Sequence, residues 1–308
     1  MMASRALPLA IIGGLAAGLL FAAMLTGSLG GMILFWMAPL PLFAVGLRLG
    51  LQPVAVAGLA GTIAVAIGDL SLGLVFASMV VLPILVLTSL ALVIPRARVA
   101  SVLVLGLTGL GLAGFALACF FAADQDGGLQ GVVTAAVRET ADQTAEQFPE
   151  VPRIPAELLD GIGLWLPGFF AAVCLVIFAG NGMLALGLLG RFGGGLVPPP
   201  AMASIAVPRW VGIGFVAAVA AAAAGSDGIE FAGWNLAQIL SVPLLFGGLG
   251  VVHALLARHP ARAVWLAIFY GVILGPVFTV GLVVILGLIE QWVGLRQRFA
   301  GASGRGEE

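Results

Sequence analysis

The stretch ALPLAIIGGLAAGLLFA, residues 6–22, contains no charged side chain and carries a small residue at every fourth position. These small residues are Ala6, Ala10, Gly14, Gly18 and Ala22. Residues four apart are neighbours on the surface of a helix, so the five form one strip. Small side chains in such a strip let a second helix approach closely within a membrane. The stretch therefore predicts a membrane-spanning helix with a partner: another part of this chain, a second copy or a different protein.

The whole chain has the composition of a membrane protein. Of its 308 residues, 61% are hydrophobic and 9% are charged, whereas charged residues make up about 25% of a typical soluble domain. Long uncharged runs of this kind cross bilayers as helices. We therefore expect an all-α fold, a polytopic transmembrane helix bundle in contact with the lipid bilayer. The net charge of −1 provides no basic surface, so no nucleic acid partner is expected.

Apolar runs of roughly spanning length recur along the chain, separated by short breaks that contain Gly, Pro or Arg. One carboxylate in such a break, Asp69 in GDLS, has the position of an N-cap for the helix that follows. The runs predict nine spans, at residues 7–26, 29–47, 52–68, 70–94, 99–122, 162–189, 209–224, 232–257 and 263–289.

The distribution of arginine predicts the orientation of these spans, because cytoplasmic loops are enriched in basic residues. Every second break contains arginine. The alternate breaks contain Asp69, the acidic segment 123–161, and Asp227 with Glu230. The N-terminus is therefore expected in the cytoplasm, and the membrane is expected to be the bacterial cytoplasmic (inner) membrane. The basic breaks hold Arg5, Arg48, Arg96, Arg98, Arg191, Arg209, Arg258 and Arg262.

The last run does not fit this pattern as a simple span. Nine spans would place the arginines of the C-terminal tail, Arg296, Arg298 and Arg305, on the outer side. The run 263–289 is interrupted at Gly275-Pro276, and each half is too short to cross a core of about 30 Å. The alternative is therefore eight spans and a re-entrant segment, which returns the tail to the cytoplasm.

Two segments divide the chain. Residues 190–208, GRFGGGLVPPPAMASIAVP, are rich in Gly and Pro and predict a cytoplasmic linker without regular structure. This linker separates a six-span block, 1–189, from a three-span block with a short tail, 209–308. The acidic segment 123–161 belongs to the first block and is expected outside the cytoplasm.

The acidic segment contains an amphipathic helix. Its polar face is acidic, so binding to an anionic lipid surface is disfavoured. Two interpretations of 129–148 stay open: a solvated helix that rests on the rim of the bundle, or a lid over an outward-facing cavity. The apolar face predicted at helical spacing consists of Leu129, Val132, Val133, Ala136, Val137, Ala141, Ala145 and Phe148.

Catalytic chemistry has no visible site in the sequence. All 13 basic residues are arginine, so the chain lacks a lysine for a P-loop or a Schiff base. Paired carboxylates, metalloprotease patterns and nucleophile elbows are also missing. Cys119 and Cys174 are isolated within apolar runs, as small hydrophobic residues are. We therefore expect no enzymatic activity, no cofactor and no bound metal.

His253, in GGLGVVHALLARHP, is the intramembrane ionisable candidate. It precedes Arg258 by only about 7 Å of helix, which places it near the cytoplasmic boundary. It has either an interfacial or hydrogen-bonded structural role, or a functional one. The only other histidine is His259, so the residues do not form a metal-binding pattern.

Three amide side chains within the spans are candidates for binding a neutral or zwitterionic solute: Asn181, Asn235 and Gln238. Asn235 and Gln238 are three residues apart, so they share a helix face. The alternative for all three is interhelical hydrogen bonding, which is a frequent use of such residues in membranes.

Four stretches resemble the YybS-like family of uncharacterised bacterial membrane proteins: NGMLALGLLGRF, VPRW, PLLFGGLGVVHALLAR and LGLIEQWVGLRQR. This family is similar, at a distance, to the S components of energy-coupling factor transporters, which are six-span proteins that bind vitamins. In S components a small-residue pattern on the first helix lies against a transmembrane coupling subunit. The resemblance implies a similar role for the strip from Ala6 to Ala22, and a six-span block before the linker.

Two functions of different classes follow. The first is a non-catalytic, S-component-like transport subunit that binds a small neutral or apolar solute from the outer side, with 129–148 as its cover. This function requires a coupling subunit and separate ATPases as partners. The alternative is a structural or scaffolding membrane protein that packs against partner membrane proteins and transports nothing. A cavity that opens outward and is lined by a few polar groups would favour the first.

Overall fold

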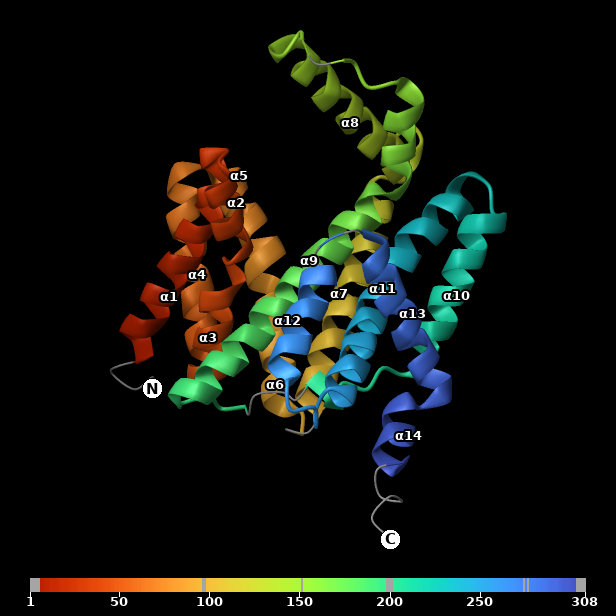
Figure 1. Ribbon diagram of the computed structural model, residues 1–308. Helices are drawn as coiled ribbons and strands as arrows, with labels where there is room; N and C mark the ends of the chain where they lie inside the picture. Colours follow the sequence, from red (N-terminus) through yellow and green to blue (C-terminus); the bar gives the residue numbers. More distant parts are fainter. Residues whose placement is uncertain are drawn as a thin grey trace. The chain divides into compact units, whose positions relative to one another are not determined.

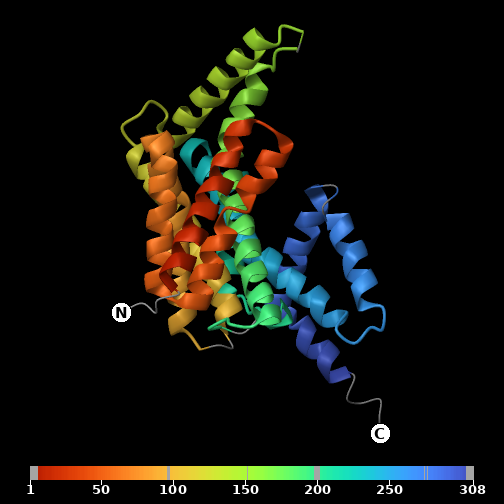
Figure 2. The ribbon, with the colours of Figure 1, turned by 90° about the vertical axis from the view of Figure 1, so that its left-hand side faces the viewer.

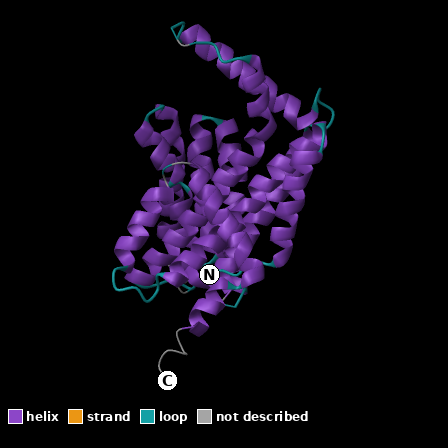
Figure 3. Ribbon diagram, turned by 45° about the vertical axis from the view of Figure 1, so that its right-hand side comes forward, coloured by secondary structure: helices purple, strands orange, loops and turns teal. Residues whose placement is uncertain are grey.

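The computed structural model describes residues 6–95, 98–150, 152–197, 202–273, 275 and 277–302. Within these ranges every regular element is a helix and none is a strand, which confirms the all-α fold (Figure 1, Figure 3). The expectations for Arg5, Arg96, Pro276 and Arg305 concern residues outside this description.

The helices follow one another with short breaks. The described helices are α1 (Ala6–Ala22), η1 (Ala23–Thr26), α2 (Leu29–Trp36), α3 (Pro39–Leu49), α4 (Leu51–Gly68), α5 (Leu70–Phe76), η2 (Ala77–Val81), α6 (Leu82–Val93), α7 (Val99–Phe121), α8 (Gly128–Gln147), α9 (Ala156–Phe192), η4 (Met202–Ser204), α10 (Arg209–Ala224), α11 (Asp227–Leu255), α12 (Arg262–Ile273), α13 (Val277–Val293) and α14 (Leu295–Ala302).

Seven helical segments among the described residues are long and apolar enough to cross a membrane. They coincide with seven of the nine predicted spans, and up to eight are reached if the bent pair near the C-terminus is one span. The polytopic bundle is therefore confirmed, with a span count close to the predicted one. The seven segments are Ala6–Thr26, Leu29–Leu49, Leu51–Gly68, Leu70–Val93, Val99–Phe121, Ala156–Phe192 and Asp227–Leu255.

The predicted span 209–224 forms a helix with those bounds, α10. Its 16 residues extend about 24 Å, which is less than the core thickness of about 30 Å. This helix is therefore a short apolar helix rather than a full-length span by the criteria of length and composition.

The predicted span 263–289 is not a straight helix. It is divided into α12 and α13, whose axes differ by 118°. The Thr279 hydroxyl on α13 donates to the carbonyl oxygens of Val272 and Ile273, at 3.3 and 3.4 Å, and so satisfies backbone groups that the end of α12 leaves open. This geometry is that of a broken span or a re-entrant loop.

Two compact units make up the chain. One unit contains residues from 1–107 and 176–205, and the other contains residues from 108–175 and 206–308. The boundaries fall within α7 and within α9, so each of these helices contributes one part to each unit. The composition-based division into 1–189, 190–208 and 209–308 stays a prediction.

In the first unit, α4 packs against the small-residue strip of α1. A Cβ added to Gly14 would overlap the carbonyl oxygen of Ala57, and one added to Gly61 would lie 2.6 Å from the Gly14 carbonyl oxygen. Ala10 is completely buried, whereas Ala6 and Ala22 at the ends of the strip are half-buried. The partner helix of this strip in the structure is thus another part of the same chain, and small residues on both helices permit the close approach.

Aromatic side chains fill the rest of this unit's core. Phe76 and Phe43 are fully buried. The rings of Phe21 and Phe76 meet edge to face at 5.1 Å, and those of Phe43 and Phe178 at 6.4 Å, the arrangement that ring quadrupoles favour.

Asp69 caps α5 as predicted, because its carboxylate accepts from the N–H of Leu72 at 3.0 Å.

The segment 190–208 is only partly irregular. Its described residues include the end of α9 and the short helix η4, and the N–H of Leu196 donates to the carbonyl oxygen of Leu47 at 2.8 Å. Gly193 and Gly194 have φ angles of 76° and 100°, which glycine adopts without steric cost.

In the second unit, α11 is the central helix. Nearly three-quarters of its spanning window, 72%, is buried. A Cβ on Gly233 would overlap the backbone of Ala222 on α10, and one on Gly248 would overlap the carbonyl oxygen of Val283 on α13. The glycines of α11 therefore allow α10 and α13 to pack on either side of it.

An arm formed by α8 and the first turns of α9 projects from the other helices of this unit, as Figure 1 and Figure 2 both show. The helix α8 confirms the predicted helix over 129–148, shifted by one residue. At 37 residues, α9 is about 55 Å long, and a membrane core of about 30 Å takes little more than half of it. The remainder extends beyond the span as one side of the arm.

Candidate functional site

The candidate residue Asn235 lies beside a proline in α9. Pro167 lies inside α9 and has no N–H, so the carbonyl oxygen four residues before it lacks its usual helical donor. The Asn235 side chain accepts from the N–H of Gly168 and donates to the carbonyl oxygen of Leu164 at 2.9 Å. In an uninterrupted helix these two backbone groups, four residues apart, would pair with each other. Asn235 therefore provides hydrogen-bond partners for two backbone groups next to the proline, as neighbouring helices do in membrane proteins.

Every polar atom of the Asn235 amide has a partner. Its nitrogen also donates to the carbonyl oxygen of Phe231 at 2.6 Å, and the residue is 0% exposed. A Cβ on Gly168 would lie 2.5 Å from the Cα of Asn235, so the two helices are in backbone contact here. In the structure this residue is used for interhelical bonding, the alternative that the sequence left open.

Gln238 acts on the same stretch of α9 one turn further along. Its amide nitrogen donates to the carbonyl oxygen of Trp165 at 3.0 Å and to that of Trp234 at 3.2 Å. The predicted shared face of Asn235 and Gln238 is therefore the face that contacts α9 around Pro167.

Asn181 lies in the other unit and is 3% exposed. Its nitrogen donates to the carbonyl oxygens of Trp36 at 2.9 Å and Ile177 at 2.8 Å. Its oxygen is buried without a hydrogen-bond partner among the described residues. Asn181 thus joins α9 to the end of α2, in a different unit from the other two amides, and solute binding by any of the three stays a prediction.

His253 is hydrogen-bonded to Tyr270, the single tyrosine of the chain. The distance from its Nε2 to the Tyr270 hydroxyl is 2.9 Å, and the two rings meet at 6.0 Å. The bond joins α11 to α12, none of whose residues is buried. Of the structural and functional interpretations of His253, the structural one agrees with this hydrogen bond. The described residues contain no group of three His, Cys, Asp or Glu side chains placed to hold a metal ion.

A concave site of the second unit lies at the base of the arm, and we call it the outer cavity. Its volume is about 1040 Å³. It is bounded by the end of α7, the first half of α8, the start of α9 and the start of α11. Its charged lining residues are Arg138, Asp160, Asp227 and Glu230, and its apolar lining includes Leu129, Leu164 and Phe231.

The charges of the outer cavity are unequal. Arg138 forms an ion pair with Asp160, with Nη2 and Oδ1 at 2.5 Å, so these two charges offset each other. Asp227 and Glu230 have no ion pair among the described residues. The charged residues of the lining therefore have an excess of carboxylate, which favours a group that donates hydrogen bonds or carries positive charge.

Asp227 is also the only described residue other than glycine with a positive φ, at 48°. Asp tolerates this left-handed region better than most residues, and residues in unusual backbone regions cluster at functional sites. On the opposite wall, Gly127 and Gly128 begin α8 with φ angles of 71° and 58°. Two consecutive left-handed residues bring the chain around sharply from α7 into α8.

Beneath the outer cavity lies the Asn235 bond network. Leu164 and Phe231 line the cavity, and Asn235 binds the carbonyl oxygens of both. The amide predicted to contact a solute is thus one layer below the cavity, where it holds two lining residues in place. From the sequence, Asp227 and Glu230 could be placed only in a break between spans, because the helices that form the cavity are far apart in the chain.

Comparison with known proteins gives a family for the chain. No curated protein and no solved structure matches it. The family model described as "Predicted membrane protein (DUF2232)" matches residues 15–290. This range contains the outer cavity, all three amide candidates and His253. Since the match covers most of the sequence, the chain belongs to the DUF2232 family of predicted membrane proteins.

Proposed function

We propose that this protein is a non-catalytic, solute-binding subunit of a membrane transport system. The solute is small and neutral or zwitterionic, and it enters the outer cavity from the extracytoplasmic side. The observation that carries the proposal is the cavity itself, whose volume of about 1040 Å³ is at the upper end of the range for small-molecule sites, about 300–1,000 Å³. A scaffolding protein needs no such polar hollow.

The lining explains the class of solute. Asp227 and Glu230 supply carboxylates for a positive group, and the Arg138–Asp160 ion pair beside them adds polar atoms whose charges offset each other. Leu164 and Phe231 form an apolar floor. A molecule with a positive group and an apolar part complements this set, whereas a purely apolar solute would leave the carboxylates without partners.

In the proposed orientation, the arm lies on the outer side of the bacterial cytoplasmic membrane. Both ends of the chain lie on its cytoplasmic side. Arg191 at the end of α9, Arg209 at the start of α10 and Arg258 after α11 then lie on the cytoplasmic side, in keeping with the positive-inside rule. The bend of 118° between α12 and α13 is compatible with a re-entrant segment, and in the proposal this segment puts Arg296 and Arg298 on the same side as Arg258.

Energy for transport would come from separate polypeptides. The chain has no lysine and therefore no P-loop for ATP, so the proposal includes a coupling subunit with ATPases, as in S components. The strip from Ala10 to Gly18 is covered by α4. A coupling subunit would therefore contact the outward side of α1, where Ile12 and Leu19 are 62% and 73% exposed.

The test is native mass spectrometry of the protein purified in lipid nanodiscs, combined with identification of any small molecule it releases. We expect one reproducible ligand, lost in the Asp227→Asn, Glu230→Gln double variant. The control is Glu139→Gln, which removes a carboxylate from α8 outside the outer cavity. A wild-type protein that is reproducibly empty and captures no ATPase would overturn the transport function in favour of scaffolding.

A further inference from the structure

A second cavity lies within the arm itself, and we call it the arm cavity. Its volume is about 570 Å³. One wall is the apolar face of α8, including Val133, Val137 and Ala141. The other wall is formed by the chain that returns from the tip of the arm and by the start of α9, including Ile162 and Leu166.

The arm cavity has almost no free polar group. The hydroxyls of Thr140 and Thr144, which line it, donate to the backbone oxygens of Ala136 and Thr140, each at 2.8 Å. Both hydroxyl protons are thus used in hydrogen bonds within α8. A ligand in this space must therefore be apolar over most of its surface, because a polar ligand would lose its hydrogen bonds to water without replacement.

One charged residue lines the arm cavity, Arg153. It has no ion pair among the described residues. A smaller cavity of about 370 Å³ adjoins at this point and is also lined by Arg153, together with Arg138 and Asp142. Since Arg138 is paired with Asp160, Arg153 is the cation left to receive an anionic group where the apolar and polar spaces meet.

The dimensions correspond to one hydrocarbon chain. The part of α8 that lines the arm cavity, residues 132–145, is about 20 Å long, and one leaflet of a bilayer core is about 15 Å thick. The cavity also reaches Ile162 and Leu166, at the start of the predicted span 162–189. With that predicted boundary, this end of the arm cavity adjoins the hydrocarbon of the bilayer.

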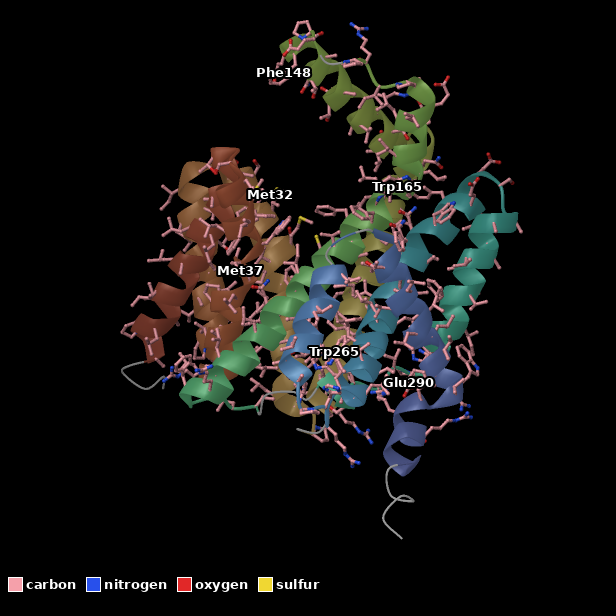
Figure 4. The ribbon with its side chains drawn as sticks, viewed as in Figure 1. Met32, Met37, Phe148, Trp165, Trp265 and Glu290 are labelled. Atoms are coloured by element: carbon pink, nitrogen blue, oxygen red, sulfur yellow. The ribbon has the colours of Figure 1, made fainter. Side chains whose placement is uncertain are left out.

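The location of apolar side chains along the arm supports the same occupant. Phe148, which lies at the end of the arm far from Trp165 (Figure 4), is 49% exposed. Ile154, on the chain that follows, is 50% exposed. Large exposed apolar surfaces outside a membrane core mark binding sites. A hydrocarbon chain in the arm cavity would lie along the same side of α8.

We propose that the arm cavity binds an aliphatic amphiphile, with its hydrocarbon chain between α8 and α9 and its anionic head on Arg153. The site is separate from the outer cavity and does not depend on transport of a solute there. A free fatty acid and an anionic phospholipid share this chemistry, and the experiment distinguishes them.

The test uses photoactivatable palmitate and photoactivatable phosphatidylglycerol, each added to the protein in phosphatidylcholine nanodiscs. Tryptic peptides are then mapped, since cleavage at Arg138 and Arg153 isolates residues 139–153. We expect label on this peptide from palmitate, from phosphatidylglycerol or from both, and the stronger label identifies the source. Label absent from 139–153 with both probes would overturn the site.

Chain length provides a second readout. Unlabelled alkyl carboxylates should compete about fourfold better for each added methylene, until the cavity is filled and the gain stops. The corresponding alcohols should compete about tenfold less well, because they lack the charge-assisted bond to the guanidinium. In Arg153→Gln the acid and the alcohol should compete equally. Competition without a length limit would instead indicate partition into the bilayer and would overturn the proposal.

Substitutions test the position of the chain. Ala141→Trp fills the arm cavity and should reduce labelling at least tenfold, whereas Gln143→Trp, on the exposed side of α8 and outside the cavities described above, should not. Equal labelling of the two variants would contradict the proposal. If Ala141→Trp does not fold, Ala145→Leu decides the point in the same way. The Asp227→Asn, Glu230→Gln variant should retain full labelling, which separates this site from the proposed function.

Discussion

Asn235 on α11 accepts a hydrogen bond from the backbone N–H of Gly168, the residue that follows Pro167 in α9. The same side chain donates to the carbonyl oxygen of Leu164. One amide thus takes the place of a helical bond, and it does so at 0% exposure beneath the outer cavity. The proline in one helix and the amide in the other are therefore two parts of one feature.

This pairing predicts a specific non-additivity. Asn235→Ala leaves buried backbone groups without partners and should lower the free energy of unfolding by about 2 kcal/mol, within the range of about 1–3 kcal/mol for such groups. Pro167→Ala restores the N–H of residue 167 and removes the proline ring. The N–H of Gly168 should then bond directly to the carbonyl oxygen of Leu164. Asn235→Ala should therefore cost less in the Pro167→Ala background. Unfolding of the four proteins in a double-mutant cycle measures the difference, and strictly additive effects would contradict the bridging role.

Close packing of α1 on α4 predicts a contrast between two glycines. Gly14→Ala places a methyl group against the backbone of Ala57 and should destabilise the protein by about 1–3 kcal/mol, as overpacking does. Gly109→Ala, in α7, meets nothing within 4 Å and should be neutral or stabilising by up to about 1 kcal/mol, because alanine favours helix. Thermal unfolding in detergent compares them, and equal midpoints would refute the close approach.

The cap at Asp69 predicts a dependence on pH. The pKa of Asp69 lies below its ordinary value because the Ser71 hydroxyl and the Leu72 N–H donate to the carboxylate. A carboxyl group with a lowered pKa in the folded state stabilises that state above the unfolded pKa, which is about 3.9. The stabilisation is lost as the pH falls through the folded pKa.

The corresponding experiment compares wild type with Asp69→Asn, which can still accept the cap hydrogen bond but does not titrate near pH 4. The difference between their unfolding midpoints should be constant near neutral pH and should change below about pH 4. A difference that is independent of pH down to pH 2 would show that the carboxylate does not contribute through its charge.

The bend between α12 and α13 predicts the side of the C-terminal helix. In a background where Cys119 and Cys174 are replaced by alanine, single cysteines at His259 and Gln297, both exposed, should react with a membrane-impermeant reagent only after the cytoplasmic side is opened. A cysteine at Gly127 should react from outside. Reaction of Gln297→Cys from outside would instead require that 263–289 crosses the membrane.

The hydrogen bond between His253 and Tyr270 predicts how α12 is held. Tyr270→Phe removes the bond between α11 and α12 but keeps the ring, and it should cost about 0.5–1.5 kcal/mol. Because none of the residues of α12 is buried, the loss should appear first as faster hydrogen exchange in α12. Phe269→Leu, which removes the neighbouring ring but keeps the bond, is the control. Unchanged exchange in Tyr270→Phe would show that the bond does not anchor the helix.

Much of the helical architecture was predictable from the sequence. Apolar runs between charged breaks located the helices, because a backbone in hydrocarbon must satisfy its own hydrogen bonds and does so as a helix. The N-cap at Asp69 and the amphipathic helix α8 were also predictable, since both depend on residues close together in the chain. The break at Gly275 was visible, but its angle was not.

The candidate site was less predictable. Asn235 and Gln238 were correctly placed on one face, but the sequence could not show that this face meets Pro167, about 70 residues away in the chain. The outer cavity combines α7, α8, α9 and α11, and no spacing pattern links residues from four helices. Asp227 and Glu230 therefore appeared only as charges at the end of a span.

By itself, the sequence determined that this chain is a helical membrane protein and where most of its helices begin and end, because those properties depend on local composition and on the cost of burying backbone in lipid. Only the tertiary structure decided which helix covers the small-residue strip of α1, what Asn235 binds, and where cavities remain. These depend on side-chain volumes that meet across distant helices, and that complementarity is not encoded in any local pattern.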